Sequence, residues 1–122
     1  MNLSGKAVNY WMKELKIATE NVLVIVDDIA LPFGNLRMRA KGSSAGHNGL
    51  KNIEEVTGGN NFPRLKFGIG NDFHAGKQAD YVLSNFPKGN LAELTIKMDK
   101  AIEMVLSFCT IGVQRTMNQF ND

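Results

Sequence analysis

KGSSAGHNGL, residues 41–50, is a glycine-rich segment between two stretches of regular hydrophobic periodicity. Residues 35–40 before it alternate apolar and polar side chains, as a strand does, and residues 50–56 after it have helical spacing. Its three glycines let the backbone adopt positive φ and approach a ligand closely. His47 and Asn48 then stand at the start of the helix, where unpaired N–H groups favour anionic or carbonyl oxygens. An ordinary helix N-terminus gives the same pattern, so this segment alone identifies no function.

The composition is that of a globular protein. Hydrophobic residues make up 43% and charged residues 21% of the 122 positions, which excludes disordered and fibrous classes and suits a single domain over residues 1–122. The single cysteine, Cys109, excludes an internal disulfide and favours a reducing cytoplasm. Its place on the apolar side of a helical pattern predicts a buried thiol. No apolar run reaches the roughly 20 residues of a membrane span, so we expect no membrane association.

An apolar, β-branched run, residues 22–26, predicts a strand buried on both faces. It is followed directly by Asp27 and Asp28. Acidic residues at the carboxyl end of a buried parallel strand stand where open α/β sheets bind their ligands. A turn-forming or helix-capping pair is the competing interpretation.

The middle of the chain is basic. Residues 35–70 hold six Lys or Arg and two Glu, a local net charge of +4 within a chain of +2. In the strands expected near 35–40 and 64–70, alternation places Arg39, Arg64 and Lys66 outward, where Arg39 and Lys66 would hold one phosphate between them. A solvated strand face is the alternative.

Helical periodicity predicts the remaining elements. An amphipathic helix over 5–16 has Ser4 as its N-cap and an apolar stripe through Trp11 and Leu15. A short helix is expected at 78–85, and Asn90 begins a long one that extends to about residue 116. The apolar stripe of that helix is expected to lie in the core: Leu94, Met98, Ala101, Ile102, Val105, Phe108, Cys109 and Gly112. The sequence thus predicts an α/β fold with a mixed, largely parallel sheet flanked by helices.

The chemistry-bearing residues are amides and acids. Two histidines without metal-ligand spacing predict no metal site, and no phosphate-binding or serine-nucleophile motif is present, so we expect no cofactor. Asn2, Asp27, Asp28, His47 and Asn48 remain. A carboxylate beside a histidine strengthens it as a base toward water, and amides bind peptide groups. This set suits hydrolysis of an ester or amide whose substrate has a peptide part and a phosphate part.

The chain resembles a bacterial-type peptidyl-tRNA hydrolase. The resemblance rests on MNLSGKAV at residues 1–8, VIVDD at 24–28 with LPFG at 31–34, AGHNGLK at 45–51 and RLKFGIG at 64–70, and it continues in DYVL at 80–83. These motifs follow one another in order over essentially the whole chain.

The resemblance implies an esterase that releases tRNA from peptidyl-tRNA in stalled translation. In the family a histidine is the general base, and Asp27 matches the aspartate that holds it. Asn2 and Asn48 match the asparagines that position the peptide and water, with Met1 and His47 beside them in the substrate site. Arg39 and Lys66 match the basic pair that grips tRNA phosphate. No metal or organic cofactor is implied.

One family segment is missing, since neither His47 nor His74 matches the histidine base. The resemblance implies an N-terminally incomplete chain that carries about the C-terminal two thirds of the fold without its first strand or strands. We expect such a chain to hydrolyse peptidyl-tRNA weakly or not at all and to self-associate over the uncovered strand. The alternatives are a tRNA- or RNA-binding module without catalysis and a nonfunctional fragment.

Overall fold

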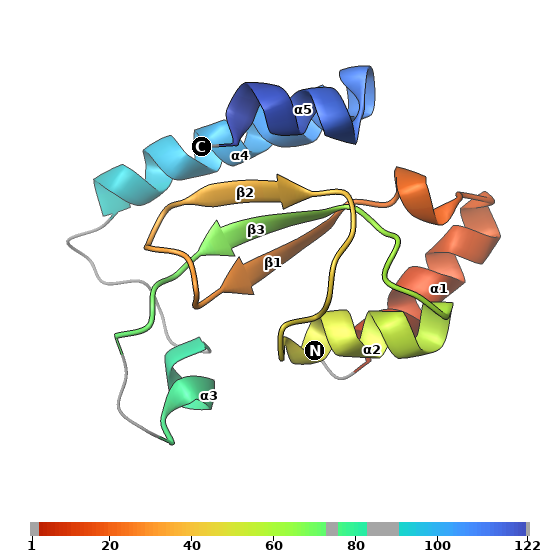
Figure 1. Cartoon of the computed structure of the whole chain (residues 1–122), viewed down its shortest axis with the longest axis horizontal. Coiled ribbons are helices and arrows are strands. Elements are labelled where there is room, and N and C mark those ends of the chain that lie inside the picture. The colour runs from red at the N-terminus through yellow and green to blue at the C-terminus, as the bar shows by residue number, and fades with distance from the viewer. Residues whose placement is uncertain (1–2, 73–75, 83–90, 122) are drawn as a thin grey trace. The chain divides into compact units, whose positions relative to one another are not determined.

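The computed structural model describes residues 3–72, 76–82 and 91–121. Helices and strands follow one another along the chain (Figure 1). In chain order the elements are helix α1 (Ser4–Leu15), the 3-10 turn η1 (Thr19–Asn21), strand β1 (Val24–Asp28), strand β2 (Leu36–Arg39), helix α2 (Asn48–Thr57), strand β3 (Arg64–Gly68), helix α3 (Gln78–Val82), helix α4 (Leu91–Ile111) and helix α5 (Val113–Phe120).

The three described strands form one mixed sheet in the order β1-β3-β2. Val24 N donates to Pro63 O at 3.0 Å and Ile69 N donates to Asp28 O at 3.0 Å, so β1 and β3 run in parallel. Gly34 N donates to Gly68 O and Gly68 N to Asn35 O, so the chain entering β2 runs antiparallel to β3. The predicted α/β class with a mixed sheet is confirmed, and a parallel majority stays a prediction because these strands give one pair of each kind.

The chain divides into two compact units, which we describe separately. Unit 1 comprises Met1–Val26 and Arg39–Leu65, and unit 2 comprises Asp27–Met38 and Lys66–Asp122. The single domain predicted over residues 1–122 therefore stays a prediction.

Helices α1 and α2 of unit 1 pack side by side (Figure 1) through a glycine. Gly5 is buried, and its N–H donates to the Asn52 side chain at 2.6 Å. A Cβ at Gly5 would lie 2.5 Å from Asn52 O, so only glycine permits this approach. The helix predicted over 5–16 is confirmed within one residue at each end, and of its apolar stripe Val8 packs against the core, whereas Trp11 is 57% and Leu15 59% exposed.

Two predictions for unit 1 are wrong. The N-cap of α1 is Leu3, without a side-chain cap, because the helix already begins at Ser4. The strand predicted over 22–26 begins at Val24 and is not buried on both faces. Val26 packs in the core with Leu50, Ile53 and Phe62, whereas Ile25 points the other way from this edge strand and is 61% exposed.

In unit 2, β2 follows its predicted alternation. Leu36 and Met38 are buried, Arg37 is half-buried and Arg39, which belongs to unit 1, is exposed. The outer edge of β2 is paired by a side chain from the C-terminal end of the chain. Met38 N donates to Asn121 Oδ1 at 2.8 Å, and Asn121 Nδ2 donates to Met38 O at 2.8 Å. One carboxamide therefore satisfies both backbone groups of a fully buried strand residue.

The long C-terminal helix departs from its prediction. It ends at Ile111, Gly112 takes φ 87°, and α5 begins at Val113. The stripe expected in the core is wrong for three of its members: Met98 and Ile102 are more than half exposed and Cys109 is an exposed thiol, whereas Leu94, Val105 and Phe108 are half-buried. The helix is apolar on several faces, and the face that packs inward carries the fully buried Met104. Among the described residues, no helix combines the length and apolar character needed to span a bilayer.

Replacing Asn121 with alanine is expected to cost about 1–3 kcal/mol of unfolding free energy, because a buried N–H and C=O lose their partners together. Urea unfolding measures the change. Asn118→Ala, at an exposed position of helix α5, which ends directly before Asn121, is the control and should be nearly neutral. Equal stability of the two variants would show that the Asn121 pair contributes nothing.

Candidate functional site

In unit 1 the glycine-rich segment, residues 41–50, connects β2 to helix α2 and forms the first turn of that helix. Gly42 and Gly46 have φ 154° and 84°, and Ala45 has φ 49°, a left-handed conformation that side chains disfavour. The predicted positive φ values are therefore confirmed. Asn48 is the first residue of α2 and its side chain is exposed.

His47 is the N-cap of α2. Leu50 N donates to His47 Nδ1 at 3.2 Å, and His47 N donates to Ser44 O at 2.9 Å. Because Nδ1 accepts this bond, a neutral ring carries its proton on Nε2. The cap fixes the imidazole at the start of the helix beside Asn48, which is the ordinary structural role of an N-cap residue, and a substrate-binding role for His47 stays a prediction.

Asp27 and Asp28 are the last two residues of β1 and lie in unit 2. Asp28 Oδ1 accepts a hydrogen bond from Ala30 N at 2.7 Å, and its Oδ2 lies 3.7 Å from Lys66 Nζ. The turn-forming interpretation is thus confirmed for Asp28. Asp27 is half-buried at the carboxyl end of a strand that is parallel to its neighbour, as the ligand-binding interpretation requires.

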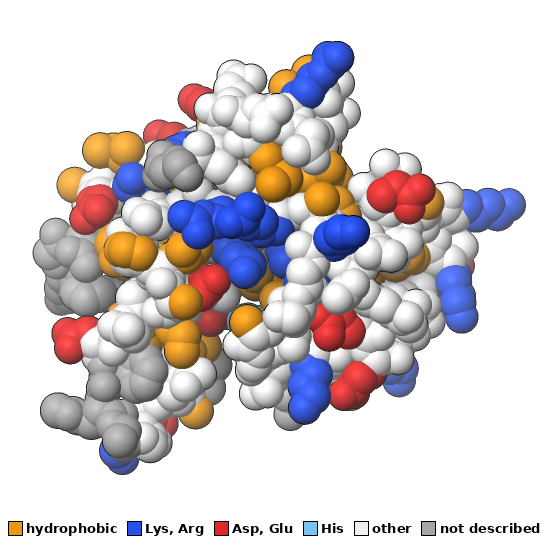
Figure 2. Space-filling model, in the orientation of Figure 1, with side chains coloured by type: hydrophobic (Ala, Val, Ile, Leu, Met, Phe, Trp, Pro, Cys, Tyr) orange, Lys and Arg blue, Asp and Glu red, His pale blue; other side chains and the backbone are white. Residues whose placement is uncertain are grey.

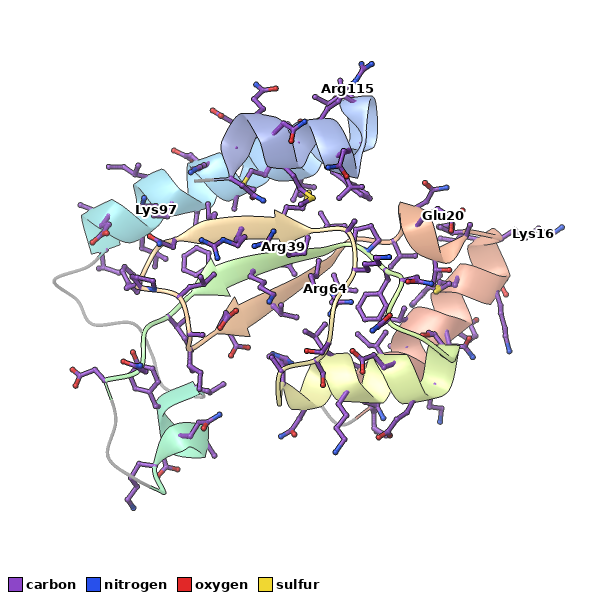
Figure 3. All side chains as sticks on the ribbon, viewed as in Figure 1. Lys16, Glu20, Arg39, Arg64, Lys97 and Arg115 are labelled. Atoms are coloured by element: carbon purple, nitrogen blue, oxygen red, sulfur yellow. The ribbon has the colours of Figure 1, made fainter. Side chains whose placement is uncertain are left out.

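Figure 2 shows lysine and arginine side chains exposed on this face. Lys66 faces Asp28 with both side chains about one fifth exposed. Arg39 ends β2 and is exposed (Figure 3). Sequence reasoning missed the ion pair of Lys66, since nothing in the alternation of β3 reveals a partner on β1.

Arg64, predicted to point outward, is wholly buried. It begins β3 directly after a loop, and its guanidinium lies 4.3 Å from the centre of the Phe62 ring and bonds to backbone carbonyls of unit 1. Burial lowers the pKa of Arg64 from its usual value, and the charge of Glu54 opposes that shift. The alternation of inward and outward side chains along a strand does not determine the exposure of its first residue, because the adjoining loops pack against that residue.

The structure brings together only some of the predicted site residues. His47 and Asn48 adjoin in unit 1, and Asp28 contacts Lys66 in unit 2. The convergence of Asp27 and Lys66 with Asn48 and Arg39 joins residues of different units and stays a prediction. Met1 and Asn2 lie outside the described residues, as do His74 and Asn90. Within the described ranges, no group of three or more His, Cys, Asp or Glu is placed to hold a metal ion.

Comparison with known proteins covers the whole chain. The family model described as peptidyl-tRNA hydrolase matches residues 1–122. The chain is 54% identical over 122 residues to the peptidyl-tRNA hydrolase of Parabacteroides distasonis, and 56% identical over 121 residues to that of Cytophaga hutchinsonii. These matches take in 100% and 99% of this chain, and 65% and 64% of the respective relatives.

A solved structure agrees with the fold. The crystal structure of peptidyl-tRNA hydrolase from Acinetobacter baumannii matches with a TM-score of 0.88 and 32% sequence identity, over 99% of this chain and 61% of that one. The chain therefore spans less than two thirds of the length of these relatives. Since the family model matches residues 1–122 and the relative from Parabacteroides distasonis is 54% identical over the whole chain, the chain belongs to the peptidyl-tRNA hydrolase family.

Proposed function

We propose that this chain supplies the substrate-positioning part of an esterase that hydrolyses the bond between a peptide and the 3′ end of tRNA. The observation that carries the proposal is the mouth of α2, where an exposed asparagine amide follows a glycine-rich loop with positive φ angles. Family membership over the whole length supports the same reaction class. Such a protein would act in the cytoplasm, where peptidyl-tRNA arises in translation.

Each proposed site residue has a chemical role. Asn48 and Asn2 bind the peptide backbone and the attacking water, with Met1 and His47 lining the same part of the substrate site. The Asp27 carboxylate orients the histidine that removes a proton from water. Water attacks the ester carbonyl, and the ribose oxygen leaves with a proton. No metal or organic cofactor takes part in this scheme.

Neither histidine of this chain is proposed as that base, because the family resemblance places His47 beside Asn48 and gives His74 no catalytic match. The region by which the relatives are longer would supply the base together with the first strand or strands of the sheet. Without a general base the rate falls by about 10²–10⁴. The chain alone is therefore expected to turn over peptidyl-tRNA weakly or not at all.

Adding the upstream segment of a relative tests the proposal. A fusion of that segment to this chain, assayed on a model peptidyl-tRNA, should hydrolyse the ester about 10²–10⁴ times faster than the chain alone. Asp27→Asn in the fusion should remove most of this gain, while Asp72→Asn, at an exposed loop position, should leave it unchanged. A correctly folded fusion that binds tRNA without hydrolysing it would instead favour the RNA-binding module, and one with neither property would favour a nonfunctional fragment.

The proposed phosphate grip of Arg39 and Lys66 predicts an effect of the neighbouring acid. Asp28→Asn removes the negative charge 3.7 Å from Lys66 Nζ, so tRNA affinity should rise severalfold, whereas Lys66→Met should lower it. Because the pair makes only two contacts, log K should fall gently against log salt, by about −0.9 per phosphate neutralised on duplex and about −0.7 on single strand.

Filter binding across a salt series measures both effects. Lys77 forms a more exposed pair with Asp80 at 3.9 Å, so Lys77→Met is the matched control and should change neither affinity nor slope. If the tRNA affinity is unchanged in both Asp28→Asn and Lys66→Met, Lys66 does not bind tRNA phosphate.

We also propose that the isolated chain self-associates through β1. This strand lies at an edge of the described sheet, and its Ile25 is 61% exposed, a combination that favours pairing with another strand. Sedimentation at micromolar concentration should show a dimer or larger species, which Ile25→Lys should dissociate. A monomeric unsubstituted chain would refute the association.

A further inference from the structure

Arg64 is the largest fully buried side chain among the described residues, and it carries a charge. Burying a guanidinium costs free energy unless hydrogen bonds and opposite charge compensate it. The Phe62 ring covers one face of this guanidinium, and the charge of Glu54 partly offsets its desolvation. Glu54 Oε1 and Arg64 Nε are nonetheless buried without hydrogen-bond partners in the described part of the chain. This incomplete compensation points to a role other than stability alone.

The hydrogen bonds of Arg64 connect two segments of unit 1. Nη1 donates to Ser43 O at 3.3 Å, within the glycine-rich loop. Nη2 donates to Asn60 O at 2.9 Å and to Phe62 O at 3.2 Å, in the segment that leads into β3. Gly42 N donates to Asn60 O as well, at 3.4 Å. Because the guanidinium is a rigid planar fork, it holds both segments at a fixed separation, which an ammonium group does not.

The loop that Arg64 binds contains a residue with a strained backbone. Ala45 has φ 49° and lies between Ser43, whose carbonyl Arg64 binds, and the N-cap His47. A non-glycine residue in this region is strained and persists only when its surroundings fix it. The hydrogen bond from His47 N to Ser44 O fixes the far end of the loop, and Arg64 fixes the near end. Figure 3 shows Arg64 beside the chain that leads from β2 into α2.

We propose that Arg64 is a positioning residue for the substrate site, setting through Ser43 the loop conformation that presents His47 and Asn48. The proposal rests on the proposed function for its catalytic consequence and on the loop geometry for everything else. Since Arg64 is 0% exposed, it acts only through the loop and does not touch a substrate.

The first test uses the unsubstituted chain and needs no tRNA. In ¹⁵N NMR spectra the Arg64 Nη protons should give separate, slowly exchanging signals, because carbonyl oxygens hold them. Exposed Arg115 should give one averaged signal and is the internal reference. An averaged Arg64 signal like that of Arg115 would overturn the proposal.

The second test is Arg64→Lys, which keeps the charge and removes the fork. Amide exchange of Gly46 and His47 should accelerate about tenfold or more, and the His47 ring nitrogen signals should shift, because the loop loses its near anchor. Arg115→Lys is the matched control and should change neither. Folded Arg64→Lys protein with unchanged loop exchange would contradict the proposal.

The catalytic consequence is measured in the fusion with the upstream segment. Arg64→Lys should lower kcat per folded molecule about tenfold or more while tRNA affinity and its salt slope stay within about twofold, since Arg39 and Lys66 are untouched. A loss of folded protein alone would lower the total activity and the total tRNA bound in proportion, would leave kcat per folded molecule unchanged, and would indicate a purely structural role. If the loop signals change but the unsubstituted fusion shows no hydrolysis, the positioning of the loop stands and the proposed function fails.

Discussion

Gly68→Ala is expected to lower the unfolding free energy of the chain by about 3 kcal/mol, near the upper end for an overpacked position. A Cβ on Gly68 would lie 2.1 Å from Pro32 O and 2.9 Å from Leu31 O, both of them backbone atoms. The residue has no room to shift, because its N–H donates to Asn35 O at 2.7 Å and its carbonyl accepts from Gly34 N at 2.9 Å. A shift of Gly68 that relieves the clash therefore breaks the hydrogen bonds that join β3 to the turn before β2.

Urea unfolding followed by far-UV circular dichroism measures this effect. Gly59→Ala is the matched control, since a Cβ there meets no atom within 4 Å and the glycine has no left-handed φ. The control should stay within about 0.5 kcal/mol of the unsubstituted chain. A Gly68→Ala protein as stable as Gly59→Ala would mean that the chain from Leu31 to Asn35 yields freely.

Phe62→Ala is the second large effect, with an expected loss of about 3–5 kcal/mol. Phe62 is 1% exposed and packs with Val26, Leu50 and Ile53 in the core of unit 1. Its ring also covers the guanidinium of Arg64, so the alanine variant loses a core side chain and exposes a buried charge to an unfilled space. Since small proteins unfold at about 5–15 kcal/mol, this loss removes a large part of the stability of the unit.

The same measurement on Trp11→Ala gives the comparison. Trp11 is the larger aromatic side chain but is 57% exposed, so its removal should cost less than half as much. Phe62→Leu should recover most of the loss, because it keeps the apolar volume beneath Arg64. If Phe62→Ala and Trp11→Ala unfold at the same urea concentration, the core of unit 1 does not centre on Phe62.

Local patterns predicted the elements well where one face alone is apolar. The alternation through Leu36 and Met38 identified both the strand and its buried face, whereas β1 extends beyond the predicted apolar run and ends at Asp28, the second of the two acids. In α4 the same method failed, because apolar residues lie on several faces and tertiary packing decides which one is buried. Met104 faces inward there, whereas Ile102 and Cys109 do not.

The site was predicted less completely, because several of its contacts join residues that are far apart in the sequence. The mouth of α2 depends on neighbouring residues, and the glycine-rich sequence predicted its backbone. The contacts of Lys66 with Asp28 and of Gly5 with Asn52 join residues far apart in sequence. Arg64 reaches back 21 residues to Ser43, so its burial depends on a loop that no periodicity describes. Whether Asp27 lies close to Asn48 likewise depends on contacts between residues far apart in sequence, which local patterns do not predict.

The carboxamide of Asn121 offers a donor and an acceptor spaced like those of a peptide group, and it occupies the outer border of β2 much as one residue of an additional strand would. Deamidation would turn its donor nitrogen into a second oxygen facing Met38 O, so the pair would give way to repulsion. The exposed backbone would then be a template for cross-β stacking. Deamidation of this one side chain is therefore expected to leave the β2 edge open to pairing with another strand.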